Sequence, residues 1–137
     1  MIRVLIVDDH EFVRESMAEL IGDDADITVV GACADGQEAL AASLELHPDV
    51  VLMDVSMPGM NGVDATRALV RNLPDVKVVM LTSSMRSLDV RGACEAGAVG
   101  YLAKGSDPDE VLAAIHTVAT GGTAWTRQAA DILRNAR

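Results

Sequence analysis

The chain has 137 residues, half of them apolar, and a formal net charge of −10. This length leaves room for one domain with a sizeable core. The acidic balance, with Lys77 and Lys104 as the only lysines, argues against direct nucleic-acid binding, because phosphate contacts require a basic face. No segment offers the roughly 18 uninterrupted apolar residues of a membrane span, and the first residues predict a strand rather than a signal peptide. We therefore expect a cytoplasmic protein without a membrane partner.

Short apolar runs rich in β-branched residues predict strands buried on both faces of a parallel sheet. These runs cover residues 4–7, 50–53, 76–81 and 99–102. A further strand is predicted over residues 27–32. The strands are separated by longer segments with helical signals, so we expect strands and helices to alternate.

A helix is predicted after each strand, from the spacing of apolar residues and from capping signals. The predicted helices run from Val13 to Gly22, from a cap at Asp35 to Pro48, from a cap at Asn61 to Pro74, over 87–95, and from a cap at Asp107 to Gly121. The fourth is the weakest, because Gly92 lies inside it and few large apolar residues line any face. We expect that helix to be thinly packed and locally unstable.

Five strands alternating with five helices predict an α/β domain with a flavodoxin-like, doubly wound parallel sheet of order 2-1-3-4-5 and helices on both faces. Residues 1–121 are expected to form this domain. Residues 122–137 are expected to be a linker or a short appended helix, with the helix beginning near Thr126.

Polar side chains follow the ends of the apolar runs. In chain order they are Asp8, Asp9, Asp54, Thr82 and Lys104. Parallel strands bring their carboxyl ends to one edge of the sheet, so these groups should converge in the crevice where such folds bind ligands. Three carboxylates in one crevice repel each other, and a divalent cation removes that conflict. The set therefore predicts a site for Mg²⁺ or Mn²⁺ beside a phosphoryl group.

The expected chemistry is formation of an aspartyl phosphate on Asp54, which ends the central strand. Asp9 and Asp54 are expected as direct metal ligands, with Asp8 acting directly or through water and Ser56 contributing its backbone carbonyl. Lys104 would neutralise phosphoryl charge, and the Thr82 hydroxyl would donate a hydrogen bond to a phosphoryl oxygen.

Each of these residues has an ordinary explanation when it is taken alone. An aspartate at a strand end is often a helix cap, and a threonine in a strand often reflects β-propensity. Their joint placement at one sheet edge argues against coincidence. Cys33 and Cys94 lack metal-ligand spacing and are expected to be small buried residues. His10, His47 and His116 are expected at the surface or at helix ends.

Four motifs in this chain resemble the receiver domain of two-component response regulators over about residues 2–121. The motifs are Val7-Asp8-Asp9-His10, Met53-Asp54-Val55-Ser56-Met57-Pro58-Gly59-Met60-Asn61-Gly62, Leu81-Thr82-Ser83 and Gly100-Tyr101-Leu102-Ala103-Lys104. The resemblance implies Asp54 as phosphoacceptor, Asp8 and Asp9 as magnesium ligands, and Lys104 as phosphate contact. It also implies Thr82 and Tyr101 as switch residues, with Tyr101 turning inward as Thr82 moves toward the phosphoryl group.

The segment from Asp8 to Arg14, and the glycine pair 121–122 before a short helix, are similar to the NarL/LuxR subfamily. This resemblance implies a sensor histidine kinase as phosphodonor and homodimer formation on phosphorylation. Members usually carry a C-terminal helix-turn-helix domain, which residues 1–137 do not contain. We therefore expect either transcriptional control through a DNA-binding domain outside this chain or a single-domain regulator. Many receivers have proline after the lysine, whereas Gly105 follows Lys104 here, so we expect a trans peptide bond there.

A phosphate-independent interaction module, a pseudo-receiver, is the main alternative function. A haloacid-dehalogenase-type phosphatase would need an Asp-x-Asp arrangement after the first strand, which residues 8–10 do not provide. A flavodoxin would need a hydroxyl-rich phosphate loop there, and a cobalamin module would need glycine where Val13 stands.

Overall fold

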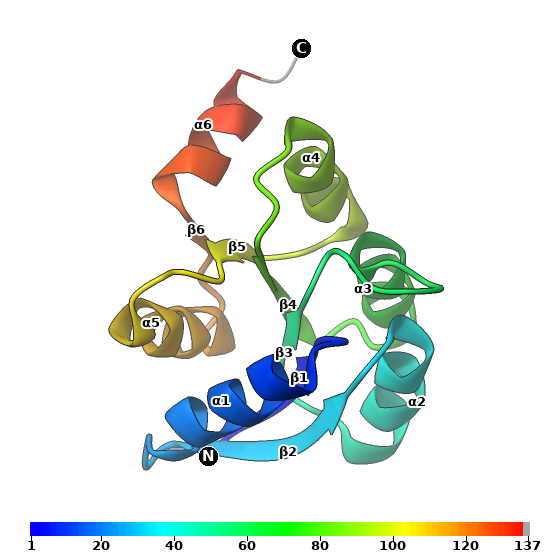
Figure 1. The fold of residues 1–137 in the computed structure, drawn as a ribbon, viewed down its shortest axis with the longest axis vertical. Helices are drawn as coiled ribbons and strands as arrows, with labels where there is room; N and C mark the ends of the chain where they lie inside the picture. The colour runs from blue at the N-terminus through cyan, green and yellow to red at the C-terminus, as the bar shows by residue number, and fades with distance from the viewer. Residues whose placement is uncertain (136–137) are drawn as a thin grey trace.

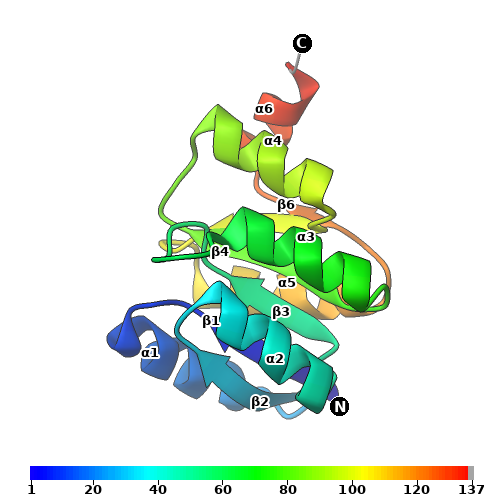
Figure 2. The ribbon, with the colours of Figure 1, turned by 90° about the vertical axis from the view of Figure 1, so that its right-hand side faces the viewer.

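The computed structural model describes residues 1–135, with helices packed on both faces of one parallel sheet (Figures 1 and 2). The sheet has six strands in the order β2-β1-β3-β4-β5-β6. The strands are β1 (Ile2–Val7), β2 (Ile27–Cys33), β3 (Val50–Met53), β4 (Lys77–Thr82), β5 (Gly100–Ala103) and β6 (Ala124–Trp125). The predicted order is confirmed for the first five strands. The predicted number is wrong, because β6 pairs in parallel with β5 at the sheet edge.

The helices form two layers. They are α1 (Glu11–Gly22), α2 (Gly36–Leu46), α3 (Gly62–Asn72), α4 (Ser87–Ala96), α5 (Pro108–Ala119) and α6 (Arg127–Arg134). One core cluster joins the sheet to α1 and α5, and the other joins it to α2, α3, α4 and α6. Figure 2 shows α2, α3 and α4 stacked along one face of the sheet.

The central strands are buried on both faces, as predicted. Leu5 and Val7 of β1 point into the cluster beneath α2 and α3, whereas Val4 and Ile6 point into the cluster beneath α1 and α5. All four side chains are at most 2% exposed. Because side chains alternate along a strand, the residues after Val7 leave the core at the carboxyl edge of the sheet.

The predicted helix caps are confirmed. The side chain of Asp35 accepts a hydrogen bond from the Glu38 amide, and Asn61 accepts one from the Asp64 amide. Asp107 caps α5 by accepting from the amide of Asp109. These bonds satisfy amide groups that have no partner inside the helix, which fixes where each helix begins.

Helix α4 packs through small side chains. Val90, Ala93 and Ala96 form its buried face, while Leu88 is 73% exposed. Helix α4 contacts α3 on one side and α6 on the other. Cys94 is exposed, so its predicted burial is wrong, because it lies on the side of α4 that faces away from the core. Cys33 is buried, and burial raises the pKa of its thiol to about 11.

The C-terminal helix lies where the sequence predicts one. Thr126 caps α6 by accepting a hydrogen bond from the Ala129 amide, and Ala129 is fully buried. Residues 136–137 of the predicted helix lie outside the described residues. Within residues 1–135 no peptide bond is cis, including the one before Gly105, and no helix is long and apolar enough to cross a membrane.

Candidate functional site

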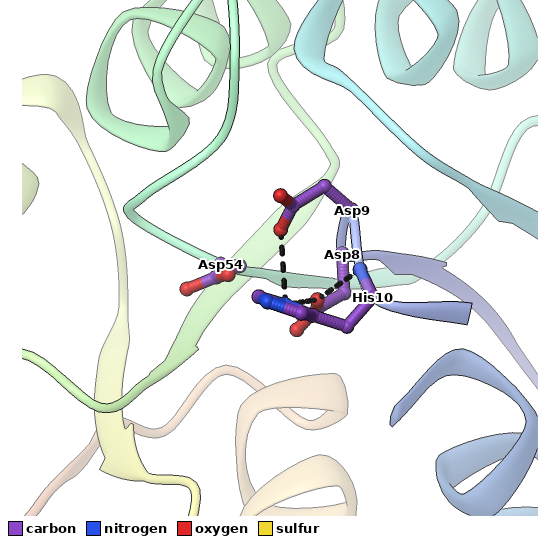
Figure 3. A group of neighbouring side chains, drawn as sticks. All are labelled: Asp8, Asp9, His10 and Asp54. Carbon is purple, nitrogen blue, oxygen red and sulfur yellow. Dashed lines mark hydrogen bonds and ion pairs between the residues drawn. The ribbon is translucent and has the colours of Figure 1, made fainter. Parts of the chain in front are cut away.

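Three aspartates meet at the carboxyl ends of β1 and β3 (Figure 3). Asp8 and Asp9 follow β1, and Asp54 follows β3. The amide of Asp8 donates to the Cys33 carbonyl, and the amide of Asp54 donates to the Val7 carbonyl, each at 3.0 Å. These bonds extend the sheet ladder by one residue. The backbone of the sheet therefore positions the two buried carboxylates, as the sequence predicts.

Lys104 joins the two buried carboxylates. Its Nζ lies 2.6 Å from Oδ2 of Asp8 and 3.2 Å from Oδ2 of Asp54. The amide of Lys104 donates to the carbonyl of Thr82, so the end of β4 positions the start of the loop that carries the lysine. Because Asp8 and Asp54 are each about 3% exposed, their negative charges lie largely outside water. The ammonium group compensates both charges.

The contacts between Asp8 and Lys104 shift both pKa values toward the charged forms. Burial by itself would raise the pKa of Asp8, but hydrogen bonds from Lys104 and from His10 outweigh burial and lower it. Burial would likewise lower the pKa of Lys104, but hydrogen bonds and charge interactions with Asp8 and Asp54 raise it. The pair is therefore ionised at neutral pH.

His10 belongs to the carboxylate cluster, which the sequence analysis missed. Its Nδ1 lies 3.0 Å from Oδ1 of Asp8 and 3.1 Å from Oδ1 of Asp9. Its amide also donates to Asp8 Oδ1 at 2.8 Å. Arg14 was missed as well, and its guanidinium donates to the Asp8 carbonyl at 2.7 Å. The sequence marks His10 and Arg14 only by their position just after Asp9, at the start of a predicted helix.

The cluster has the donor set of a divalent cation site. One ligand atom from each of Asp8, Asp9, His10 and Asp54 lies within 4.8 Å of the others. Oδ1 of Asp9 is buried and has no hydrogen-bond donor, although it lies near the His10 ring. A buried carboxylate oxygen without a donor is costly unless a cation or water satisfies it. Carboxylate oxygens in this number suit a hard cation such as Mg²⁺.

Two pockets open beside the cluster. Asp54, Thr82 and Lys104 line a pocket of about 410 Å³, and Asp9 lines a neighbouring one of about 630 Å³ with Asn61 and Met57. Ser56 borders both pockets. The structure thus brings Thr82, Lys104 and Ser56 to the same pocket as Asp54.

Tyr101 belongs to the buried core rather than to the lining of the Asp54 pocket. Its ring is fully buried, and its hydroxyl donates to the Ser84 carbonyl at 2.7 Å. Burial, together with the charge of Asp89, raises the pKa of Tyr101 to about 12. The sequence analysis expects this ring to turn inward on phosphorylation. In this structure the ring is already inward.

Gly62 is a further residue whose role the sequence analysis missed. A Cβ atom at Gly62 would lie 1.9 Å from the carbonyl oxygen of Asp54, far closer than two atoms can approach. The amide of Gly62 donates to the Val55 carbonyl, which draws the start of α3 against the end of β3. Only glycine allows this approach, so Gly62 sets the position of the loop that leaves Asp54.

Comparison with known proteins gives one consistent family. Residues 4–116 match the family described as the response regulator receiver domain. The chain is 46% identical over 121 residues to the response regulator GacA of Pseudomonas viridiflava, and 44% identical over 121 residues to the transcriptional regulatory protein LiaR of Bacillus subtilis (strain 168). These matches cover 88% of this chain but 56% and 57% of the relatives, so the chain spans about half their length.

A solved structure is similar over nearly the whole chain. It is a two-component response regulator of the LuxR family from Aurantimonas sp. SI85-9A1. The two chains share 36% identity with a TM-score of 0.90, and the match covers 96% of this chain and 94% of that one.

Proposed function

Because the chain belongs to the response regulator receiver family, and within it to the NarL/LuxR subfamily, we propose that Asp54 is its phosphoacceptor. Receivers of this family act in two-component signalling. The observation that carries the assignment to Asp54 is its place at the end of β3, beside Asp8 and against the ammonium of Lys104. The pseudo-receiver alternative is not favoured, since a carboxylate cluster and its counter-charge are both present.

The proposed reaction is attack of an Asp54 carboxylate oxygen on the phosphorus of a phosphohistidine in a sensor histidine kinase. The new P–O bond forms as the P–N bond breaks, and the histidine nitrogen leaves with the electron pair. Phosphoryl transfer depends mainly on positioning and charge neutralisation. Lys104 lines the same pocket as Asp54 and offers its ammonium to the oxygens of the incoming group.

Asp8, Asp9 and Asp54 would hold Mg²⁺ or Mn²⁺, with the carbonyl of Ser56 as a further ligand. The bound cation supplies positive charge that offsets the carboxylates and the phosphoryl oxygens. His10 occupies part of the cluster and contacts Asp8 and Asp9. Its side chain is 64% exposed, so it has room to swing away when the carboxylates bind a cation.

Thr82 is proposed as the residue that senses the phosphoryl group. Thr82 lines the Asp54 pocket, and its hydroxyl accepts a hydrogen bond from the Ser84 amide at 3.2 Å. As a donor, this hydroxyl can bind a phosphoryl oxygen. Movement of Thr82 toward that oxygen would disturb its contact with Ser84, at the start of the segment that leads to α4.

The proposed output is control of transcription through a DNA-binding domain outside residues 1–137, with homodimerisation on phosphorylation. LiaR is named a transcriptional regulatory protein, which supports this output. A cytoplasmic location follows from the same proposal, since a histidine kinase phosphorylates its receiver there.

Intact-mass measurement tests this function. We expect wild type to gain one phosphoryl group from a small phosphodonor in Mg²⁺, and to gain none in EDTA. Asp54→Asn should gain none under either condition, because an amide is not a nucleophile for this transfer. Equal incorporation in Asp54→Asn and wild type would overturn the assignment.

A further inference from the structure

A short C-terminal segment, residues 124–134, lies directly against Tyr101. We call it the C-terminal clamp. Strand β6 places Trp125 beside Tyr101, and the Thr126 amide donates to the Tyr101 carbonyl at 3.1 Å. The two rings stack with their centroids 6.4 Å apart and their planes 12° from parallel. Aromatic pairs at this separation attract each other. The clamp therefore contacts both the backbone and the ring of Tyr101.

The second half of the clamp closes the core over this ring. Ala129 of α6 is fully buried, and Ile132 and Leu133 pack against the core cluster that contains Tyr101 and Val90. Helix α6 lies beside α4 in Figure 1, and the two helices are in contact. The full burial of Tyr101 thus depends on a segment that follows it by more than twenty residues.

Strand β5 has a glycine, Gly100, at the point where β6 packs against it. A Cβ atom at Gly100 would lie 2.8 Å from the carbonyl oxygen of Ala124, which is backbone and cannot turn aside. Glycine at this position lets β6 approach β5 closely enough to pair. This observation is independent of the aromatic stack, and it shows that the docked position of β6 is built into the sheet.

Tyr101 is also connected to the Asp54 pocket. Its hydroxyl donates to the Ser84 carbonyl at 2.7 Å, and the Ser84 amide donates to the Thr82 hydroxyl at 3.2 Å. The Ser84 hydroxyl donates to Asp89 of α4 at 2.5 Å. An unbroken set of contacts therefore leads from Thr82 through Ser84 and Tyr101 to Trp125.

We propose that the C-terminal clamp holds the Tyr101 ring inside the protein, so that ring position and docking of α6 change together. We further propose that this two-state element responds to phosphorylation of Asp54, and that second statement rests on the proposed function. If the ring left the core, Trp125 would lose its partner, and if α6 undocked, the ring would meet solvent. By linkage, a group at Asp54 that favours the inward ring must also favour the docked helix. Helix α6 is then the element that carries the state of Asp54 to the far edge of the sheet.

The composition of the chain makes the proposal directly measurable. Tyr101 and Trp125 are its only tyrosine and tryptophan, so 3-fluorotyrosine labelling gives a fluorine NMR signal from Tyr101 alone. Ala129→Glu introduces a charge at a fully buried site in α6, and Gln128→Glu introduces the same charge at its exposed neighbour. Burying an uncompensated carboxylate is costly, so the first variant should undock α6 and the second should not.

In Ala129→Glu we expect amide exchange across residues 124–134 to rise more than about tenfold. The fluorine resonance should move to, or split toward, the position of a solvent-exposed ring. Wild type and Gln128→Glu should keep the buried position. Fast exchange in α6 with an unchanged fluorine resonance would overturn the coupling. If Ala129→Glu does not fold, Trp125→Ala removes the stacked ring without adding charge, and the same two outcomes apply.

A second arm tests the response to phosphorylation. Beryllofluoride with Mg²⁺, added to the folded undocking variant, should return the fluorine resonance toward the buried position and slow exchange in α6. Phosphoryl uptake is measured by intact mass on parallel samples of the same variant that receive a small phosphodonor and Mg²⁺ in place of beryllofluoride. Uptake without any change at Tyr101 or α6 overturns the phosphorylation link. Absence of uptake overturns the proposed function instead, while the metal-free comparison of variants still decides whether the clamp holds the ring.

Discussion

Lys104 is the side chain that allows two buried carboxylates to lie together. Asp8 and Asp54 each have 4% of the side chain exposed, and both contact the same ammonium group. Without that group, two negative charges would face each other largely outside water, which is strongly unfavourable.

We therefore expect Lys104→Met to lower the free energy of unfolding by about 2 kcal/mol in metal-free buffer. Lys77→Met, at the only other lysine, is the matched control and should change stability by less than about 0.5 kcal/mol. Urea denaturation measures both. Equal effects of the two substitutions would show that Lys104 is an ordinary surface charge.

Tyr101 should give the protein a specific alkaline sensitivity. Its pKa is raised from 10.0 to about 12, because the neutral phenol is favoured in the fold. This contribution to stability is complete below pH 10 and is lost as the pH rises through about 12. Tyr101→Phe should remove the loss over that window, at a cost of about 1 kcal/mol at neutral pH from the missing bond to Ser84.

The alkaline comparison is best made by chemical denaturation across the window from pH 10 to about 12 in a Cys33→Ala background. That background is needed because burial raises the pKa of the Cys33 thiol from 9.0 to about 11, which acts on stability with the same sign. We expect stability to fall with pH when Tyr101 is present, and to fall less steeply in the Tyr101→Phe variant. Identical slopes with and without the phenol would contradict the assignment to Tyr101.

At the level of the elements, the junction between β3 and α3 leaves no space for a side chain at residue 62, because Gly62 lies directly against the Asp54 carbonyl. Gly62→Ala should destabilise the fold by about 2 kcal/mol and also reduce phosphoryl uptake, since relief of the clash must move Asp54 or the loop. Gly22→Ala is a suitable control, because nothing lies within 4 Å of a Cβ atom there. Retention of wild-type stability and uptake in Gly62→Ala would refute this account of the junction.

The sequence predicts those elements that are marked by patterns several residues long, and it does not predict the shortest ones. Long apolar runs and capping residues such as Asp35 and Asn61 predict five strands and five helices that the structure confirms. Strand β6 is only two residues long, so no periodicity can reveal it. Its pairing depends on the contact of Gly100 with Ala124 and of Tyr101 with Trp125. The partners in each contact are distant in the sequence and meet only after folding.

In the candidate site, too, some residues are predicted from the sequence and others are not. The aspartates and Lys104 follow strand ends, so the topology of a parallel sheet brings them together, as predicted. His10 has no such signal, because its contact with Asp8 and Asp9 depends on a local turn. That Tyr101 turns inward on phosphorylation stays a prediction. The segment that covers its ring in this structure, residues 124–134, is too remote in the sequence for its packing to be predicted.

For the molecule as a whole, the strongly negative net charge is unlike that of a DNA-binding domain, which needs a basic surface. Its net charge of −10 opposes approach to a polyphosphate, and the described residues form one receiver-type sheet with its covering helices. We expect residues 1–137 to show no measurable DNA affinity at low salt, with or without phosphodonor, by fluorescence anisotropy. Salt-dependent binding by this chain alone would contradict that expectation.

The most direct test of the central claim is to locate the phosphoryl group chemically. Borohydride reduces an acyl phosphate to the alcohol, so a phosphorylated aspartate is converted to homoserine and can be read by peptide sequencing. Trypsin separates the candidates, because Asp8 and Asp9 precede Arg14 whereas Asp54 lies between Arg14 and Arg67. The account predicts homoserine at position 54, dependent on phosphodonor and Mg²⁺. Homoserine at position 8 or 9, or an unmodified Asp54 in protein that has gained phosphate, would contradict it.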